Sequence, residues 1–236
     1  MLWRTAVLLF AYISTVMAWL CTGKTNAELI ANMARSSIIH ADRVERAMCK
    51  VDRANYVIDK EDAYQDSPQV IGHGATISAP HMHAYATEHL LPYLHPGARV
   101  LDVGSGSWLL GGCLPPSGQV VGIEHIPELV DWSAENLRKD GLAEALDKEE
   151  IELVVGDGRL GYEQGGPYDA IHVGAAAPTL PAKLVEQLAS PGRMFIPVGT
   201  FAQHILHVDK DVNGEVTETR IMDVRYVPLT DRASQR

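Results

Sequence analysis

The sequence is poor in basic residues and in cysteine, and it contains no internal repeat. Its 20 Lys and Arg residues face 30 Asp and Glu residues, which leaves a net charge of −10. Nucleic acid demands a basic face, so this balance argues against a nucleic-acid partner. Cys21, Cys49 and Cys113 have no metal-ligand spacing and cannot all pair. They read as reduced thiols or core residues and favour a reducing compartment.

The sequence also lacks a long hydrophobic run. Its longest apolar stretch lies near the N-terminus, where a cationic start at Arg4 precedes an apolar run over 6–16 and a small-residue site at 16–18. This stretch is too short to span a membrane comfortably. Either residues 1–18 form a secretory signal, or they are an upstream extension and Met17 is the true start. We expect cytoplasmic location, with the secretory pathway as the alternative, and no stable membrane association.

Composition favours a globular protein of one domain. The chain has 236 residues, of which 46% are hydrophobic and 21% charged, which suits one large α/β domain over 19–236. Helical patterns begin at Thr25, where Asn26 is a candidate cap, and again at 42–51. Further on, strand patterns alternate with helical ones, which predicts a mostly parallel sheet. The expected strands are 99–103, 119–124, 151–155, 168–174 and 192–199, with an antiparallel pair at 204–208 and 224–227.

The most informative stretch is RVLDVGSGSW at 99–108. An apolar run ends at Asp102, and Gly104 and Gly106 then form a turn whose backbone can lie close to a ligand. A dinucleotide fingerprint would have a third glycine where this chain has Leu109, and Asp102 would repel a phosphate. An acid at this position suits a cationic ligand instead. S-adenosyl-L-methionine carries a sulfonium and an ammonium group and no phosphate.

Two further carboxylates follow later strands. Glu124 ends the second strand, 20 positions after Gly104, which is the usual offset for a carboxylate that holds a ribose diol. Asp157 lies between two glycines after the third strand, where it could accept a hydrogen bond from an adenine amino group. The alternative for Asp157 is a simple turn acid.

The segment 69–80 is dense in small residues. Such a segment is either a surface loop or backbone laid over a ligand. His81 and His83 follow at a spacing of two, which does not put them on one helix face, so we expect no metal pair there. One of these histidines is expected to pack, and the other to help close the pocket.

Several segments together resemble one enzyme family. They are DSPQ at 66–69, ATISAPHMHAY at 75–85, LDVGSGS at 101–107, VGDGR at 155–159, YDAIHVGAAAP at 168–178 and YVPLTD at 226–231. The chain resembles the animal-type protein-L-isoaspartate (D-aspartate) O-methyltransferases from about residue 17 to 231. The resemblance implies a Rossmann-like class I methyltransferase with a mostly parallel sheet, an antiparallel C-terminal hairpin and an N-terminal helical cap.

The resemblance also implies the reaction and the residues that carry it. The methyl group of S-adenosyl-L-methionine would pass to the free α-carboxylate of isoaspartyl or D-aspartyl residues in damaged peptides and proteins. Ser78 would be the active-site hydroxyl. Residues expected to contact the cofactor are Ile77, Ser78, Ala79, Pro80, His83, Asp102, Gly104, Gly106, Glu124, Asp157, Gly158 and Thr230.

The chain departs from the family pattern on one side of the expected site. The glycine loop ends in Trp108, where the family has a further glycine. The crossover helix after this loop is about one turn shorter than in the family, and the segment 200–203 contains less glycine than the family does there. These departures are compatible with weak cofactor binding, a catalytically impaired paralogue or a mis-spliced gene. A nicotinamide oxidoreductase is disfavoured by Asp102 and Leu109. The acidic charge and the absence of an apolar stripe favour a monomer.

Overall fold

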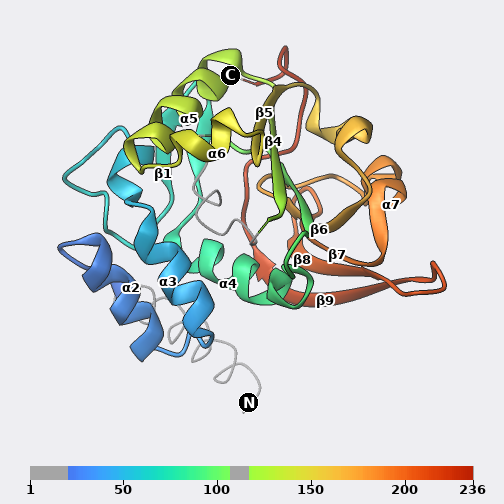
Figure 1. Cartoon of the computed structure of the whole chain (residues 1–236), viewed down its shortest axis with the longest axis horizontal. Helices are drawn as coiled ribbons and strands as arrows, with labels where there is room; N and C mark the ends of the chain where they lie inside the picture. Colours follow the sequence, from blue (N-terminus) through green and yellow to red (C-terminus); the bar gives the residue numbers. More distant parts are fainter. Residues whose placement is uncertain (1–20, 107–116, 236) are drawn as a thin grey trace.

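The computed structural model describes residues 21–106 and 117–235 (Figure 1). The predictions for 1–18, for Trp108 and Leu109 and for the shortened crossover concern residues outside these ranges. In the described ranges, no helix combines the length and hydrophobicity needed to cross a membrane. Neither Cys21, which is buried, nor Cys49, which is exposed, forms a disulfide in the described ranges.

A seven-stranded sheet forms the centre of the fold, in the order β5-β4-β3-β6-β7-β8-β9. The first five strands are parallel, and β8 and β9 extend the sheet as antiparallel strands. This confirms the predicted mostly parallel sheet. The strands are β3 (Arg99–Val103), β4 (Gln119–Glu124), β5 (Ile151–Val155), β6 (Tyr168–Val173), β7 (Leu188–Val198), β8 (Gln203–Lys210) and β9 (Val216–Val224).

The strand predicted at 224–227 is wrong, because the last strand is β9 and ends at Val224. Most of β9 is exposed at the edge of the sheet, so its side chains lack the alternation that marks a half-buried strand. The chain beyond β9 is held by the side-chain amide of Gln203. Its Nε2 donates to the carbonyl of Tyr226 (3.1 Å), and its Oε1 accepts from the Tyr226 N–H (2.6 Å).

Helices cover both faces of the sheet. On one face, α4 (Pro80–Leu90) packs through Ala86 and Leu90 against Phe195, and α5 (Pro127–Lys139) packs through Leu137 against Val120. The other face carries α7 (Ala182–Gln187), whose Leu184 joins the largest hydrophobic cluster together with side chains of β3, β4, β6 and β7. The fold therefore has three layers with a buried sheet in the middle.

The N-terminal helices α2 (Asn26–Arg35) and α3 (Asp42–Lys50) pack together beside α4, as Figure 1 shows. The predicted helix starting near Thr25 is present, but the cap is Thr25, whose Oγ1 accepts from the Glu28 N–H (3.2 Å). Asn26 has a different role. Its amide nitrogen donates to the carbonyl of Val51 (2.8 Å), so it ties the start of α2 to the end of α3.

The small-residue segment forms a hairpin, β1 (Gln69–Gly72) and β2 (Ala75–Ile77). Its turn contains His73 and Gly74, both in the left-handed region with φ of 52° and 72°. The hairpin leads directly into α4. The remaining short elements are η1 (Arg53–Tyr56), η2 (Leu91–Tyr93), α6 (Ala143–Asp147), η4 (Gly158–Leu160) and η5 (Glu163–Gly165).

A buried aromatic cluster joins α4 to the sheet. His207 of β8 is 6% exposed, and its ring centroid lies 4.5 Å from that of His89 and 5.9 Å from that of Phe195. Burial, followed by the positive charges of Arg193 and His89, lowers the pKa of His207 to about 4, and Asp209 opposes this shift. The folded protein therefore holds His207 neutral at a pH where an unfolded chain would protonate it.

The cluster predicts a loss of stability in mild acid. The pKa of His207 is about 4 when folded and about 6.5 when unfolded. Its contribution is therefore complete above pH 6.5 and is lost as the pH falls toward 4, because the unfolded chain binds the additional proton. We expect His207→Leu to remove about 2 kcal/mol of the decrease in unfolding free energy between pH 7 and 4.5. Denaturant unfolding at both pH values measures this, and an unchanged pH dependence would contradict it.

Candidate active site

A cavity of about 310 Å³, called here the Gly104 cavity, opens at the carboxyl ends of the parallel strands. This is where ligands bind in open α/β sheets. The described residues that line it come from the β1–β2 hairpin, the ends of β3, β4 and β6, the start of η4 and the C-terminal segment. They are Ile71, Gly74, Ala75, Thr76, Gly104, Gly106, Ile123, Glu124, His125, Gly158, Gly174, Ala175, Val227, Pro228, Leu229, Thr230, Ser234 and Gln235.

The glycine turn forms the floor of this cavity. Gly104 and Gly106 have φ values of 70° and 55°, which L-residues with side chains rarely adopt. The N–H of Gly104 donates to the carbonyl of Ile123 (2.9 Å), and that of Gly106 donates to Oε2 of Glu124 (3.0 Å). The turn is thus tied to the end of β4, and Gly104, Gly106 and Glu124 lie together at the cavity.

Glu124 is 7% exposed, and its carboxylate faces backbone donors. Oε1 accepts from the Ile126 N–H (3.1 Å) while Oε2 accepts from Gly106. Each carboxylate oxygen has two lone pairs, so both retain capacity for a hydroxyl group of a ligand. No Lys or Arg occurs among the described residues that line the cavity. The described lining, with a buried carboxylate and neither Lys nor Arg, suits a nucleoside with no phosphate.

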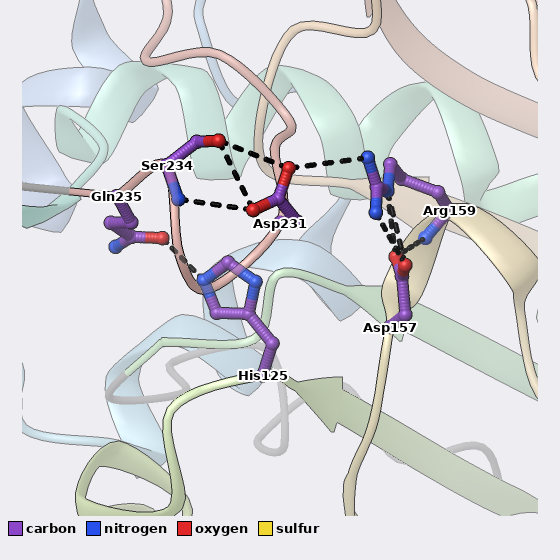
Figure 2. A network of polar contacts seen from close by, with 6 residues as sticks. All are labelled: His125, Asp157, Arg159, Asp231, Ser234 and Gln235. Atoms are coloured by element: carbon purple, nitrogen blue, oxygen red, sulfur yellow. Dashed lines mark hydrogen bonds and ion pairs between the residues drawn. The ribbon is translucent and has the colours of Figure 1, made fainter.

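Gly158 closes the cavity beside β3. A Cβ at this position would lie 2.5 Å from Cγ1 of Val103, so only glycine allows this approach. The neighbouring Asp157 does not line the cavity in the described part of the chain. Instead, Asp157 is paired with Arg159, as Figure 2 shows. Nη2 of Arg159 donates to Oδ2 of Asp157 (2.7 Å), and Nε donates to Oδ1 (2.9 Å). This hydrogen bonding to Arg159 lowers the pKa of Asp157.

The C-terminal segment covers one wall of the Gly104 cavity. Its backbone pairs with Ala176, which donates to the carbonyl of Val227 (2.8 Å) and accepts from Leu229 (2.8 Å). Figure 2 shows Asp231 facing Arg159 (3.9 Å) and Gln235 hydrogen-bonded to His125. Thr230, predicted to close over the site, lies on this wall.

A second cavity of about 720 Å³, called here the Ser78 cavity, adjoins the first. It lies between the start of α4, the turn after α2 and the chain after β9. Three residues, Thr76, Gly174 and Val227, line both cavities. The two spaces therefore meet at a shared wall between the β1–β2 hairpin, the end of β6 and the C-terminal segment.

Ser78 is held in the second cavity from two sides. The buried Arg53 donates from Nη2 to the Ser78 carbonyl (2.9 Å) and to the carbonyl of Ser67 (3.3 Å). The Tyr226 side chain shares a hydrogen bond with the Ser78 side chain. Burial raises the pKa of Tyr226 to about 12, with the hydrogen bond from Ser78 opposing the shift. Tyr226 is thus a neutral phenol that orients the serine hydroxyl.

The remaining predicted residues divide between the second cavity and the protein interior. Ala79 lines the Ser78 cavity. Ile77 is buried in a hydrophobic cluster with Tyr56 and Leu129, and Pro80 is the first residue of α4. Neither residue is among the described residues that line either cavity.

Asp102 and His83 also lie apart from both cavities in the described structure. The Asp102 side chain points toward α4, and its Oδ1 lies 2.7 Å from Nδ1 of His172. Side chains alternate along a strand, so Asp102 faces α4 whereas Leu101 and Val103 face the α7 side. His83 is buried on α4. Burial and the charges of Arg53, His172 and His81 lower its pKa well below the usual value.

Sequence patterns missed several residues of the site. The density of small residues at 69–80 was a usable signal for Gly74, Ala75 and Thr76, and the hairpin indeed lies against the cavity. Tyr226 occurs in a motif of the family resemblance, yet nothing local marked its contact with Ser78. No sequence pattern marked Gln235 as a site residue, because its position at the cavity depends on how the C-terminal segment folds back. Within the described ranges, no group of three or more His, Cys, Asp or Glu side chains could hold a metal ion.

The sheet, the glycine turn and the acidic nucleoside-sized cavity define a Rossmann-like class I S-adenosylmethionine-dependent methyltransferase. The model of one family, protein-L-isoaspartate(D-aspartate) O-methyltransferase, matches residues 24–234. The chain belongs to this family.

Individual relatives agree with this assignment. The chain is 47% identical to the Triticum aestivum protein-L-isoaspartate O-methyltransferase, over 90% of this chain and 94% of that one. It is 44% identical to the Caenorhabditis elegans protein of the same name, over 93% and 98%. A Plasmodium falciparum structure described as this enzyme with S-adenosyl-L-homocysteine superposes with a TM-score of 0.80 and 35% identity, over 88% of this chain and 99% of that one.

Proposed function

We propose that the protein transfers the methyl group of S-adenosyl-L-methionine to the free α-carboxylate of L-isoaspartyl and D-aspartyl residues in damaged proteins. The observation that carries this proposal is the meeting of the Gly104 and Ser78 cavities at Thr76, Gly174 and Val227. A methyl donor in the first cavity and a peptide carboxylate in the second would face each other across that boundary. Membership of the family supports the same reaction.

The residues of the Gly104 cavity fit the methyl donor. S-adenosyl-L-methionine, when bound, supplies a methyl group on a positively charged sulfur. The glycine turn would pass beneath the methionine portion, where a side chain would obstruct it. Glu124 would accept from the ribose hydroxyls while keeping its bonds to the backbone. Gly158 would lie against the adenine, and the C-terminal wall with Thr230 would exclude water.

The residues of the Ser78 cavity fit the acceptor. A peptide carboxylate is ionised at neutral pH, so no strong general base is needed. When the substrate binds, the Ser78 hydroxyl would turn its proton from Tyr226 to one carboxylate oxygen and leave the other oxygen aligned with the methyl group. This alignment would be the main contribution of the site to the rate. Transfer forms an O–CH₃ bond as the S–CH₃ bond breaks, and the sulfonium becomes a neutral thioether. The ester then closes spontaneously to a succinimide, which opens partly to normal aspartate.

The comparisons give no support to a catalytically impaired paralogue, since the full-length relatives are methyltransferases by name. For its setting in the cell, we propose a cytoplasmic monomer without nucleic-acid or stable membrane partners, supported by the acidic charge and by three cysteines that cannot all pair. Fractionation of cells that express the chain from Met1 or from Met17 tests the location, and sedimentation tests the oligomeric state.

The central experiment is a methyl-transfer assay on an isoaspartyl peptide and on its normal aspartyl twin. Ser78 can align a carboxylate only where the substrate backbone fits the cavity, so we expect esterification of the isoaspartyl peptide at least 100-fold faster than of its twin. Tight binding of S-adenosylhomocysteine measured by calorimetry is the companion result. Equal rates for the two peptides, or no binding of S-adenosylhomocysteine, would contradict the proposed function.

A further inference from the structure

The described rim of the Ser78 cavity contains one charged side chain without an ion-pair partner among the described residues. Its described lining includes two charged side chains, Asp223 and Arg225, and one histidine, His81. Nδ1 of His81 lies 2.8 Å from Oδ1 of Asp66. Asp223 is paired with Arg220 of the same strand. Among the residues that the structure describes, Arg225 has no such partner.

Within the described ranges, Arg225 has no carboxylate partner. Every Asp and Glu residue of the sequence lies within 21–106 or 117–235. None of them forms an ion pair with Arg225. The side chain is exposed, so its charge is available to a molecule that enters the cavity.

Arg225 is also fixed close to the acceptor site. It directly precedes Tyr226, whose backbone is clamped on both sides by Gln203 and whose side chain bonds to Ser78. The Arg225 backbone therefore cannot move far from Ser78. A peptide with its isoaspartyl carboxylate at Ser78 would pass adjacent residues, about 3.3 Å apart along an extended chain, within reach of this long side chain.

We propose that Arg225 is a specificity-determining residue, which favours isoaspartyl substrates with an acidic side chain immediately next to the damaged residue. This inference rests on the proposed function and adds a preference among its substrates. Arg225 would pair with the neighbouring carboxylate at the rim and would not touch the reacting carboxylate. Its effect should therefore fall on KM and on peptide Kd, with kcat unchanged.

The test uses amidated isoaspartyl peptides that carry Glu, Gln or Lys either before or after the isoaspartyl residue. For the wild-type protein, we expect the Glu peptide to have a KM about 3-fold lower than the Gln peptide at one of these two positions, as suits an exposed ion pair. The Lys peptide should have the highest KM. Raising ionic strength above about 0.15 M should reduce the difference, because salt screens exposed charges.

Substitutions of exposed arginines test whether Arg225 causes the preference for the Glu peptide. Arg225→Gln should abolish the Glu preference and Arg225→Glu should reverse it, with kcat on the Gln peptide unchanged. Arg46→Gln, an exposed arginine of α3 outside the cavity, should behave as wild type. Equal KM values for wild type on all peptides, or a Glu preference retained by Arg225→Gln, would overturn the inference.

The test also separates this inference from the proposed function. If the Gln peptide is methylated without any charge preference, the specificity role of Arg225 fails and the reaction stands. If no peptide is methylated, the reaction fails. The Glu preference is then measured as Kd with fluorescently labelled peptides in the presence of S-adenosylhomocysteine. Equal Kd values for the Glu and Gln peptides would overturn the role of Arg225 there too.

Discussion

Ser78→Ala is expected to lower kcat on an isoaspartyl peptide about 100-fold, the loss associated with a misaligned reacting group. The Kd of S-adenosylhomocysteine should stay within about 2-fold of wild type, because the substitution removes no contact with this ligand. A 2-fold change in Kd corresponds to about 0.4 kcal/mol of binding free energy. Ser78 lines the acceptor cavity and is not among the described residues of the Gly104 cavity. The substitution also keeps the bond from Arg53 to the Ser78 carbonyl. Single-turnover kinetics and calorimetry measure the two quantities.

Two further variants show whether the hydroxyl group is responsible. Tyr226→Phe removes the phenol that orients Ser78 and should lower kcat about 10-fold, and the double variant should be no slower than Ser78→Ala because the two groups act as one unit. Ser67→Ala is the matched control, since its carbonyl also accepts from Arg53 but its side chain does not line the cavity. Wild-type turnover by Ser78→Ala would reduce Ser78 to a packing residue.

Glu124→Ala is expected to weaken S-adenosylhomocysteine binding about 100-fold, because hydrogen bonds to a charged group contribute about 1.5–3 kcal/mol each. The substitution removes the carboxylate that holds the Gly106 N–H and faces the cavity. Glu135→Ala, an exposed carboxylate on α5, is the control and should bind normally. Circular dichroism establishes that both variants are folded.

The ribose role of Glu124 can be separated from its role in the turn. An analogue of S-adenosylhomocysteine without ribose hydroxyls should bind wild type about 10-fold more weakly than the parent, and Glu124→Ala should no longer discriminate between them. If the variant still discriminates, the carboxylate only supports the glycine turn. If Glu124→Ala binds the parent compound as tightly as wild type, both roles are wrong.

Much of the nucleoside side of the site could be predicted because its determinants are local. Gly104, Gly106 and Gly158 are required by backbone conformation or by close packing at those positions. Glu124 follows from its place at the end of a strand beside that turn. The edge strand β9 was missed because an exposed strand needs no hydrophobic alternation.

The acceptor side depended on contacts between distant parts of the chain. The sequence could mark Ser78 through its motif, but it contained no indication that Arg53, 25 residues earlier, holds its carbonyl. Asp102 illustrates the converse. Its position suggested a ligand contact, yet the pleat of β3 turns its side chain toward His172 and α4.

By itself, the sequence determined the alternation of strands and helices, the glycine turn and the carboxylate that follows the second strand, because short-range patterns and backbone sterics specify these features. Only the tertiary structure decided that two cavities share the wall formed by Thr76, Gly174 and Val227. It likewise decided that Tyr226 reaches Ser78 and that Arg225 lines the acceptor cavity. Those relations join segments about 50 to 150 residues apart, and only packing of the sheet, the hairpin and the C-terminal segment brings them together.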